Sequence, residues 1–251
     1  MLPVIRIGPA AMQSSALALI AALWLGAFVA EREFKRRGLR GDDAWNSVAI
    51  AVAVTLVTAR LVYVAQNLDT YADAWIEIFA PVPGTLALEF GAVFGILAIL
   101  GYFQHRRLDF KRVADALAPG ALVACAIIAI GQFLSGDAFG TPAELPWSIV
   151  LWGAARHPVQ LYDAFAALIG LAIIRRARAG LIALTALAWY SAARLFVDGF
   201  RADAAFLPGG YRTSQVIALA ILLIALALVA RKGESNVQVN QIQTNDQRSS
   251  G

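Results

Sequence analysis

The stretch Val113–Ser135, VADALAPGALVACAIIAIGQFLS, is a continuous apolar run in which Asp115 is the only charged residue. An α-helix rises about 1.5 Å per residue, so a run of roughly twenty residues crosses the ~30 Å hydrocarbon core of a bilayer. Six further runs have the same character. They are Ala10–Ala30, Ala44–Val64, Gly84–Phe103, Pro158–Ile174, Leu181–Phe200 and Thr213–Ala230. The sequence therefore predicts an all-α, polytopic integral membrane bundle of about seven transmembrane helices.

The composition agrees with this class. Hydrophobic residues make up 59% of the 251 residues, charged residues only 15%, and the mean hydropathy is +0.65. The runs are continuous and do not alternate, which disfavours a membrane β-barrel. The single cysteine, Cys125, excludes an intrachain disulfide, and we see no ligand cluster for a metal or an organic cofactor.

The charges of the connecting segments indicate the orientation. Most of the 21 Lys and Arg residues fall in four segments, 31–43, 104–112, 175–179 and the part after Ala230. Because Lys and Arg resist translocation, these segments should be cytoplasmic, with the N-terminus outside and the C-terminus inside. We expect residues 1–230 to form one membrane domain and residues 231–251 a disordered polar tail. The basic residues reflect orientation in the membrane rather than binding of nucleic acid.

Polar residues within the runs gather at one depth, near the outer side. Polar groups in hydrocarbon are costly and usually mark a site. The heptapeptide His157-Pro158-Val159-Gln160-Leu161-Tyr162-Asp163 opens the fifth run with four polar side chains. Other members of this level come from four further runs and their ends: Arg60, Glu89, Gln132, Asp137, Arg194, Asp198 and Arg201. Two arginines inside spans need counter-charges or an anionic ligand, and a phosphate is the natural ligand.

The sixth run places its polar residues on one helical face. Tyr190, Arg194 and Asp198 are spaced by four, and Arg201 follows three later. An Arg194–Asp198 pair along the helix would explain this stripe without a ligand. For Arg60, Glu89 and Asp163, plain interhelical pairing is as good an interpretation as ligand contact.

Three motifs resemble those of the prolipoprotein diacylglyceryl transferase family. Arg156-His157-Pro158-Val159-Gln160-Leu161-Tyr162-Asp163 is similar to the family's Arg-His-Pro-Ser-Gln-Leu-Tyr-Glu. The stretch Gly131–Asp137, with Gly140 and Pro146-Trp147, resembles the family's Gly-Asn-Phe-Ile-Asn-Gly-Glu region. The stretch Tyr190–Arg201 resembles Tyr-x-x-x-Arg-Phe-x-x-Glu-Phe-x-Arg. Weaker matches at Ala59-Arg60-Leu61 and Ser214-Gln215 extend the resemblance from about Pro3 to Leu222.

The resemblance implies transfer of a diacylglyceryl group from phosphatidylglycerol to the lipobox cysteine thiol of a prolipoprotein signal peptide, at the bacterial inner membrane. Arg194 would hold the phosphate and His157 would accept or orient a proton. The proposed substrate-binding residues are Arg60, Glu89, Gln132, Asp137, Gln160, Tyr162, Asp163, Tyr190, Asp198 and Arg201. The nucleophile belongs to the substrate, and no cofactor or metal is needed.

Three positions depart from the family pattern. Ala129 stands where the family has an arginine, Phe90 where it has a histidine, and Ser15 near a family tyrosine. Two alternatives therefore stay open. One is a paralogue that binds anionic lipid or a lipoprotein precursor without transferring it. The other, more distant, is a transporter or channel, against which the nearly unbroken apolar inner halves of the runs argue.

Overall fold

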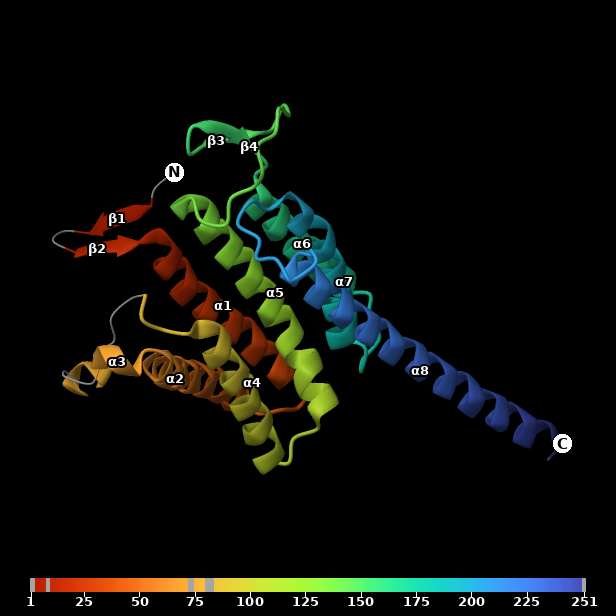
Figure 1. The fold of residues 1–251 in the computed structure, drawn as a ribbon. Helices are drawn as coiled ribbons and strands as arrows, with labels where there is room; N and C mark the ends of the chain where they lie inside the picture. The colour runs from red at the N-terminus through yellow and green to blue at the C-terminus, as the bar shows by residue number, and fades with distance from the viewer. Residues whose placement is uncertain (1–2, 8–9, 72–74, 80–83, 250–251) are drawn as a thin grey trace. The chain divides into compact units, whose positions relative to one another are not determined.

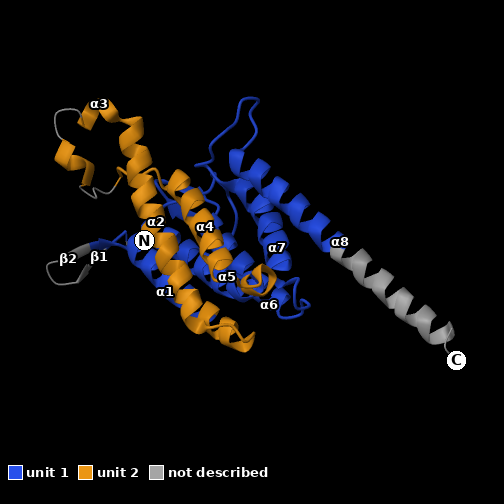
Figure 2. Ribbon diagram, turned by 90° about the horizontal axis from the view of Figure 1, so that it is seen from below, with its two compact units in different colours: residues 1–29, 114–251 blue, residues 30–113 orange. Residues whose placement is uncertain are grey.

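The computed structural model describes residues 3–7, 10–71, 75–79 and 84–249, with side chains omitted for 5–7, 10–11 and 232–249. The described part is mainly helical (Figure 1). Contacts divide the chain into two compact units, Met1–Val29 with Ala114–Gly251 as unit 1 and Ala30–Val113 as unit 2 (Figure 2).

Five of the described helices are long and apolar enough to cross a membrane. They are α1 (Ser14–Arg36), α2 (Gly41–Gln66), α4 (Leu88–His105), α5 (Phe110–Ser135) and the segment Thr213–Arg231 of α8 (Thr213–Ser249). Two shorter helices, α6 (Val159–Ile174) and α7 (Ile182–Val197), have 16 residues each. The chain is therefore a helical membrane protein.

The first apolar run is not helical throughout. We predicted a span from Ala10, but β2 (Ala10–Gln13) pairs antiparallel with β1 (Val4–Ile7), and α1 begins only at Ser14. Small and apolar residues suit either backbone, so hydrophobicity alone did not locate this boundary. At its other end α1 stops before Gly38, whose φ of +72° suits glycine, and the Leu39 N–H donates to the Phe34 carbonyl at 2.9 Å.

Unit 2 is built on a close pair of helices, α2 and α4. A Cβ added at Gly91 would lie 2.7 Å from the Ala59 Cβ, and one added at Gly95 would lie 3.0 Å from the Ala51 carbonyl oxygen. Gly91 and Gly95 are four apart and so face α2 together, the small-residue arrangement that lets membrane helices approach. Two short helices, α3 (Leu68–Tyr71) and η1 (Trp75–Phe79), lie in the connection between them.

Unit 1 contains the elements that carry the predicted motifs. Its apolar core is formed by Ala118 and Leu122 of α5, Ile174 of α6 and Ala186 of α7. A short hairpin of β3 (Ile149–Leu151) and β4 (Ala154–Arg156) follows α5 and leads into α6 (Figure 1). After α7 a single 3-10 turn, η2 (Asp198–Phe200), begins the connection to α8.

Candidate active site

Arg194 lies between two buried carboxylates at the end of α7. Its Nη1 donates to Asp163 Oδ2 of α6 at 2.9 Å, and its Nη2 lies 2.7 Å from Asp198 Oδ1. The second contact is an ion pair without hydrogen-bond alignment. The side chains of Asp163 and Asp198 are 4% and 0% exposed, whereas Arg194 keeps 26% of its side chain exposed. The guanidinium therefore joins α6, α7 and η2 and still has an accessible edge.

A second arginine, Arg201, joins this cluster. Arg201 Nη1 lies 3.6 Å from Asp163 Oδ2, and the Arg201 guanidinium also makes a two-pronged pair with Asp203 at 3.0 and 2.7 Å. Arg212, at the start of α8, donates to the backbone carbonyls of Asp198 and Arg201. These contacts fix the η2 turn and with it the position of Asp198.

Several buried acceptor atoms in the cluster have no hydrogen-bond donor among the described residues. They are Gln160 Oε1, Asp163 Oδ1 and Asp198 Oδ2. The Gln160 side chain is completely buried, and its Nε2 donates to the Asp137 carbonyl at 2.7 Å. Buried polar atoms are normally paired, so acceptors in this position favour a water or ligand that brings donors.

His157 belongs to an aromatic group at the start of α6. Its Nδ1 lies 3.4 Å from the Tyr162 hydroxyl, and its ring centroid lies 4.7 Å from that of Phe200. The Tyr162 hydroxyl also accepts a hydrogen bond from Trp147 Nε1 at 2.8 Å. Tyr162 directly precedes Asp163, so this group and the Arg194 cluster lie at the same end of α6.

The loop between α5 and α6 holds His157 in place through the backbone. The His157 N–H donates to the Thr141 carbonyl at 3.1 Å, and the Thr141 N–H donates to the Phe200 carbonyl at 2.8 Å. Arg156 donates to the carbonyls of Leu151 and Gly140 at 3.0 and 3.2 Å. A Cβ at Gly140 would lie 2.8 Å from the His157 Cβ and closer still to the His157 carbonyl oxygen. The sequence therefore needs glycine at this point of contact.

Two predicted site residues belong to unit 2. Arg60 donates to the carbonyls of Ile78 and Thr85 at 2.8 and 3.1 Å and to the Thr85 hydroxyl at 2.6 Å, and its guanidinium also contacts the Glu77 carbonyl. Arg60 thus holds the connection between α2 and α4. Glu89, in the first turn of α4, is exposed.

The remaining predicted residues differ in their surroundings. Asp137 is exposed and accepts a hydrogen bond from the Ser135 hydroxyl at 2.7 Å, while its carbonyl binds Gln160. Gln132 contributes its carbonyl to the end of α5, where it accepts the Gly136 N–H at 3.0 Å. Tyr190 lies one turn before Arg194 on α7, where its hydroxyl interacts with the Cys125 thiol.

The structure thus joins Gln160, Asp163, Arg194, Asp198 and Arg201 into one cluster, beside the His157–Tyr162 pair. Our reading of the residues gave no role to Arg212, Trp147, Phe200 or Gly140. Trp147 and Gly140 stand inside one recognised motif and Phe200 inside another, which was a signal for all three. Among the described residues, no group of three or more His, Cys, Asp and Glu is placed to hold a metal ion.

Comparison with known proteins identifies the same family as the three sequence motifs do. Residues 3–231 match the family model described as prolipoprotein diacylglyceryl transferase. A relative named phosphatidylglycerol–prolipoprotein diacylglyceryl transferase, from Clostridioides difficile (strain 630), is 35% identical over 221 residues, which is 85% of this chain and 89% of the relative. Similarly named proteins match from Synechocystis sp., at 31% over 81% of this chain and 76% of theirs, and from Streptococcus suis, at 28% over 94% of each. The chain therefore belongs to the prolipoprotein diacylglyceryl transferase family.

Proposed function

We propose that this protein transfers the diacylglyceryl group of phosphatidylglycerol to the lipobox cysteine thiol of a prolipoprotein. Family membership and the names of the relatives support the reaction. In the reaction a C–S bond forms to the diacylglyceryl carbon, the C–O bond to the phosphate breaks, and glycerol phosphate leaves. The thiol proton passes to a base. The observation that carries the proposal is Arg194, partly exposed between motifs that come from different elements.

Arg194 is the proposed phosphate ligand. A guanidinium carries more N–H donors than the two nitrogens that face Asp163 and Asp198 use, so donors remain for phosphate oxygens. The two carboxylates hold the planar group in one orientation. A preoriented donor stabilises the charge that grows on the leaving phosphate without reorganisation at the moment of reaction.

His157 is the proposed proton acceptor. The Tyr162 oxygen already accepts the Trp147 N–H and has a second lone pair for His157 Nδ1–H. That tautomer leaves Nε2 unprotonated and able to take the proton of the thiol. Trp147 and Tyr162 would then act through His157, as positioning residues.

The unpaired acceptors of Gln160, Asp163 and Asp198 fit a donor-bearing headgroup. The glycerol headgroup of phosphatidylglycerol carries hydroxyls that can donate to such oxygens. We assign Asp137 and Arg201 to the same side of the site through their contacts with this cluster, and Tyr190 through its place one turn before Arg194 on α7. Gln132 stays a proposed ligand on the resemblance, and Glu89 on its place among the polar residues expected at the outer level. The contacts of Arg60 favour shaping of the α2–α4 connection over free phosphate contact.

We also propose seven spans, with the N-terminus outside and the polar tail after residue 230 in the cytoplasm of a bacterium. Alone, α6 and α7 reach only ~24 Å of a ~30 Å core; η2 would lengthen α7 by ~6 Å, and the residues that flank α6 would complete its crossing. The cluster then lies toward the outer face, where phosphatidylglycerol and a membrane-held signal peptide with its lipobox cysteine both enter sideways.

One second candidate has support from the structure. Arg194 and Arg201 are paired with the carboxylates of Asp163, Asp198 and Asp203, and Ala129, where the family has an arginine, is buried and carries no charge. A protein that binds anionic lipid without transferring it would also fit these features.

Reconstitution distinguishes the two candidates. The full-length protein in lipid nanodiscs receives phosphatidylglycerol labelled in its acyl chains and a peptide with a lipobox cysteine. Transfer predicts a labelled thioether on the peptide and release of an equal amount of glycerol phosphate, both absent with a Cys→Ser peptide. Lipid binding without either product would establish the second candidate instead.

A further inference from the structure

An apolar groove of about 310 Å³ runs along unit 1 between α5 and α7. Its walls are mainly alanine and leucine, and its polar side chains are Cys125 and Tyr190. The residues that line it are Ala114, Leu117, Ala118, Ala121, Leu122 and Cys125 of α5 and Ala183, Ala186, Leu187 and Tyr190 of α7. The hydroxyl of Tyr190 and the thiol of Cys125 interact with each other within the groove wall.

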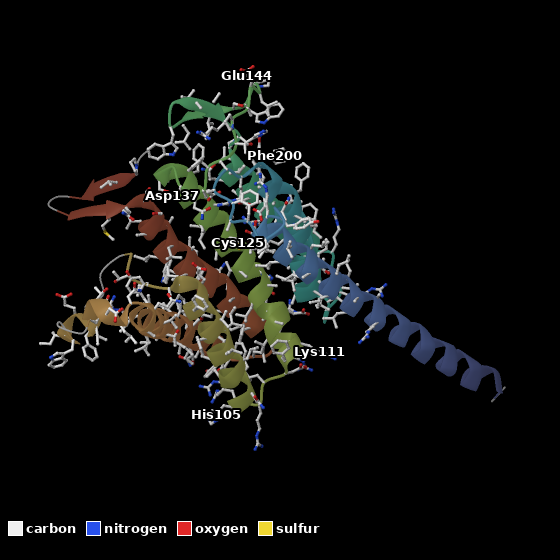
Figure 3. All side chains as sticks on the ribbon, viewed as in Figure 1. His105, Lys111, Cys125, Asp137, Glu144 and Phe200 are labelled. Carbon is white, nitrogen blue, oxygen red and sulfur yellow. The ribbon has the colours of Figure 1, made fainter. Side chains whose placement is uncertain are left out.

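The groove has the length of one acyl chain. From Ala114 to Cys125 the α5 wall extends ~17 Å along the helix axis, and one leaflet of the hydrocarbon core is ~15 Å deep. Figure 3 shows Cys125 partway along α5, with Lys111 near one end of the helix and Asp137 beyond the other. The α5 residues that line the groove recur at every third or fourth position, so the groove follows the helix axis, which in a membrane-spanning helix is the direction in which lipid chains lie.

Small side chains make the groove, and one side of it is open. Ala114, Ala118 and Ala121 of α5 face Ala183 and Ala186 of α7. Leu187 is 43% exposed and Ala121 is also exposed, so a chain can enter from the lipid phase rather than through the protein. An apolar hollow of this kind at a lipid-facing surface is filled by hydrocarbon and not by water.

The end of the groove that Tyr190 lines lies next to the charged cluster of Arg194. Tyr190 lines the groove, and Arg194 follows four residues later on the same face of α7. A phosphate held at Arg194 would thus place the glycerol backbone of its lipid within one helical turn of the groove mouth.

We infer that this groove binds one acyl chain of the donor phosphatidylglycerol and makes transfer sensitive to the length of that chain. The inference rests on the proposed function, because Arg194 must hold the headgroup. The length, the apolar lining and the continuity with the cluster select a lipid tail as the occupant. Headgroup recognition distinguishes the donor from the surrounding lipid, which shares its tails.

Photolabelling tests occupancy without requiring turnover. Phosphatidylglycerol with a photoreactive group at the end of one acyl chain is compared with phosphatidylethanolamine carrying the same chain, in nanodiscs of the full-length protein. We expect the phosphatidylglycerol probe to label peptides containing Ala114 to Leu117 or Ala183 at least about tenfold more strongly, and unlabelled phosphatidylglycerol to compete. Equal labelling by both probes would mean bulk lipid only and would overturn the inference.

Chain-length selectivity is the functional test. Ala121→Phe fills the groove from its open side, and Ala220→Phe, at an exposed alanine of α8 that does not line it, is the matched control. We expect Ala121→Phe to lower the rate with dioleoyl relative to didecanoyl donor by about tenfold, because each buried methylene that is displaced weakens binding. An unchanged ratio in a variant that still transfers would contradict the groove assignment.

Different results would reject the transfer reaction and the groove assignment. Absence of thioether product with every donor in the wild-type protein would reject the transfer reaction, and photolabelling would still decide the groove. If Ala121→Phe does not fold, Leu187→Ala widens the same wall and should raise the rate with branched-chain donors relative to dioleoyl donor. No such shift would count against the groove.

Discussion

Gly140→Ala should impair transfer by moving His157. The added Cβ would lie 2.8 Å from the His157 Cβ, whereas carbon atoms need ~3.5 Å, so His157 must move by ~0.7 Å. Neither group can rotate away, because the closest atoms belong to the His157 backbone and Cβ. Overpacking of this kind costs ~1–3 kcal/mol in stability, and a displacement of ~1 Å at a catalytic group can cost ~10²-fold in rate.

The assay is the initial rate of thioether formation on a lipobox peptide in nanodiscs, together with thermal unfolding in detergent. We expect the Gly140→Ala rate to be about tenfold to a hundredfold lower. Gly101→Ala in α4 is the matched control, since a Cβ there meets nothing within 4 Å, and its rate should equal that of the wild type. A Gly140→Ala enzyme within twofold of wild type would refute the role given to this contact.

Three further substitutions test other contacts. Trp147→Phe removes the donor to the Tyr162 hydroxyl and should lower the transfer rate about three- to tenfold, since a neutral hydrogen bond contributes ~0.5–1.5 kcal/mol; an unchanged rate would separate Trp147 from the site. Asp115→Ala removes the carboxylate that accepts N–H groups at the start of α7, so the free energy of unfolding should fall by ~1–3 kcal/mol and lower the midpoint of thermal unfolding; an unaltered midpoint would argue against this anchor. Arg60→Met removes the donor to the Ile78 and Thr85 carbonyls in the α2–α4 connection, so limited proteolysis near these two residues should become faster. Equal cleavage rates of variant and wild type would show that Arg60 does not hold this connection.

The apolar runs predicted the helices well because burial in lipid needs continuous hydrophobicity, which the sequence displays directly. Two N-terminal ends were wrong: Ala10–Gln13, before α1, forms a strand paired with β1, and the third run was predicted from Gly84, whereas α4 begins at Leu88. That strand depends on a partner strand earlier in the chain, and hydropathy does not record such pairing. The family resemblance of the three motifs was confirmed by the match over residues 3–231.

The local part of the site was also visible in the sequence. The spacing of Arg194 and Asp198 by four gave their pairing along the helix, which the structure shows at 2.7 Å. The approach of Asp163 from α6, the contact of Gly140 with His157 and the hold of Arg212 on η2 all join segments distant in the chain. Such contacts depend on how the helices pack against one another, and the pattern of residues along the chain does not reveal that packing.

The groove between α5 and α7 is a second feature that could not be predicted from the sequence. Its alanines look like ordinary packing residues in the sequence, because small side chains serve close helix contacts and hollows equally well. Only the distance between the two helices decides which of these an alanine makes.

The most direct measurement of the central claim is the rate of thioether formation by Arg194→Gln. Arg176→Gln, at an exposed arginine after α6, is the matched control, and thermal unfolding of each variant reports that it is folded. If Arg194 stabilises the leaving phosphate, the folded Arg194→Gln protein should be slower by ~10²-fold or more, with Arg176→Gln near wild type. A folded Arg194→Gln protein that transfers at the wild-type rate would contradict the account.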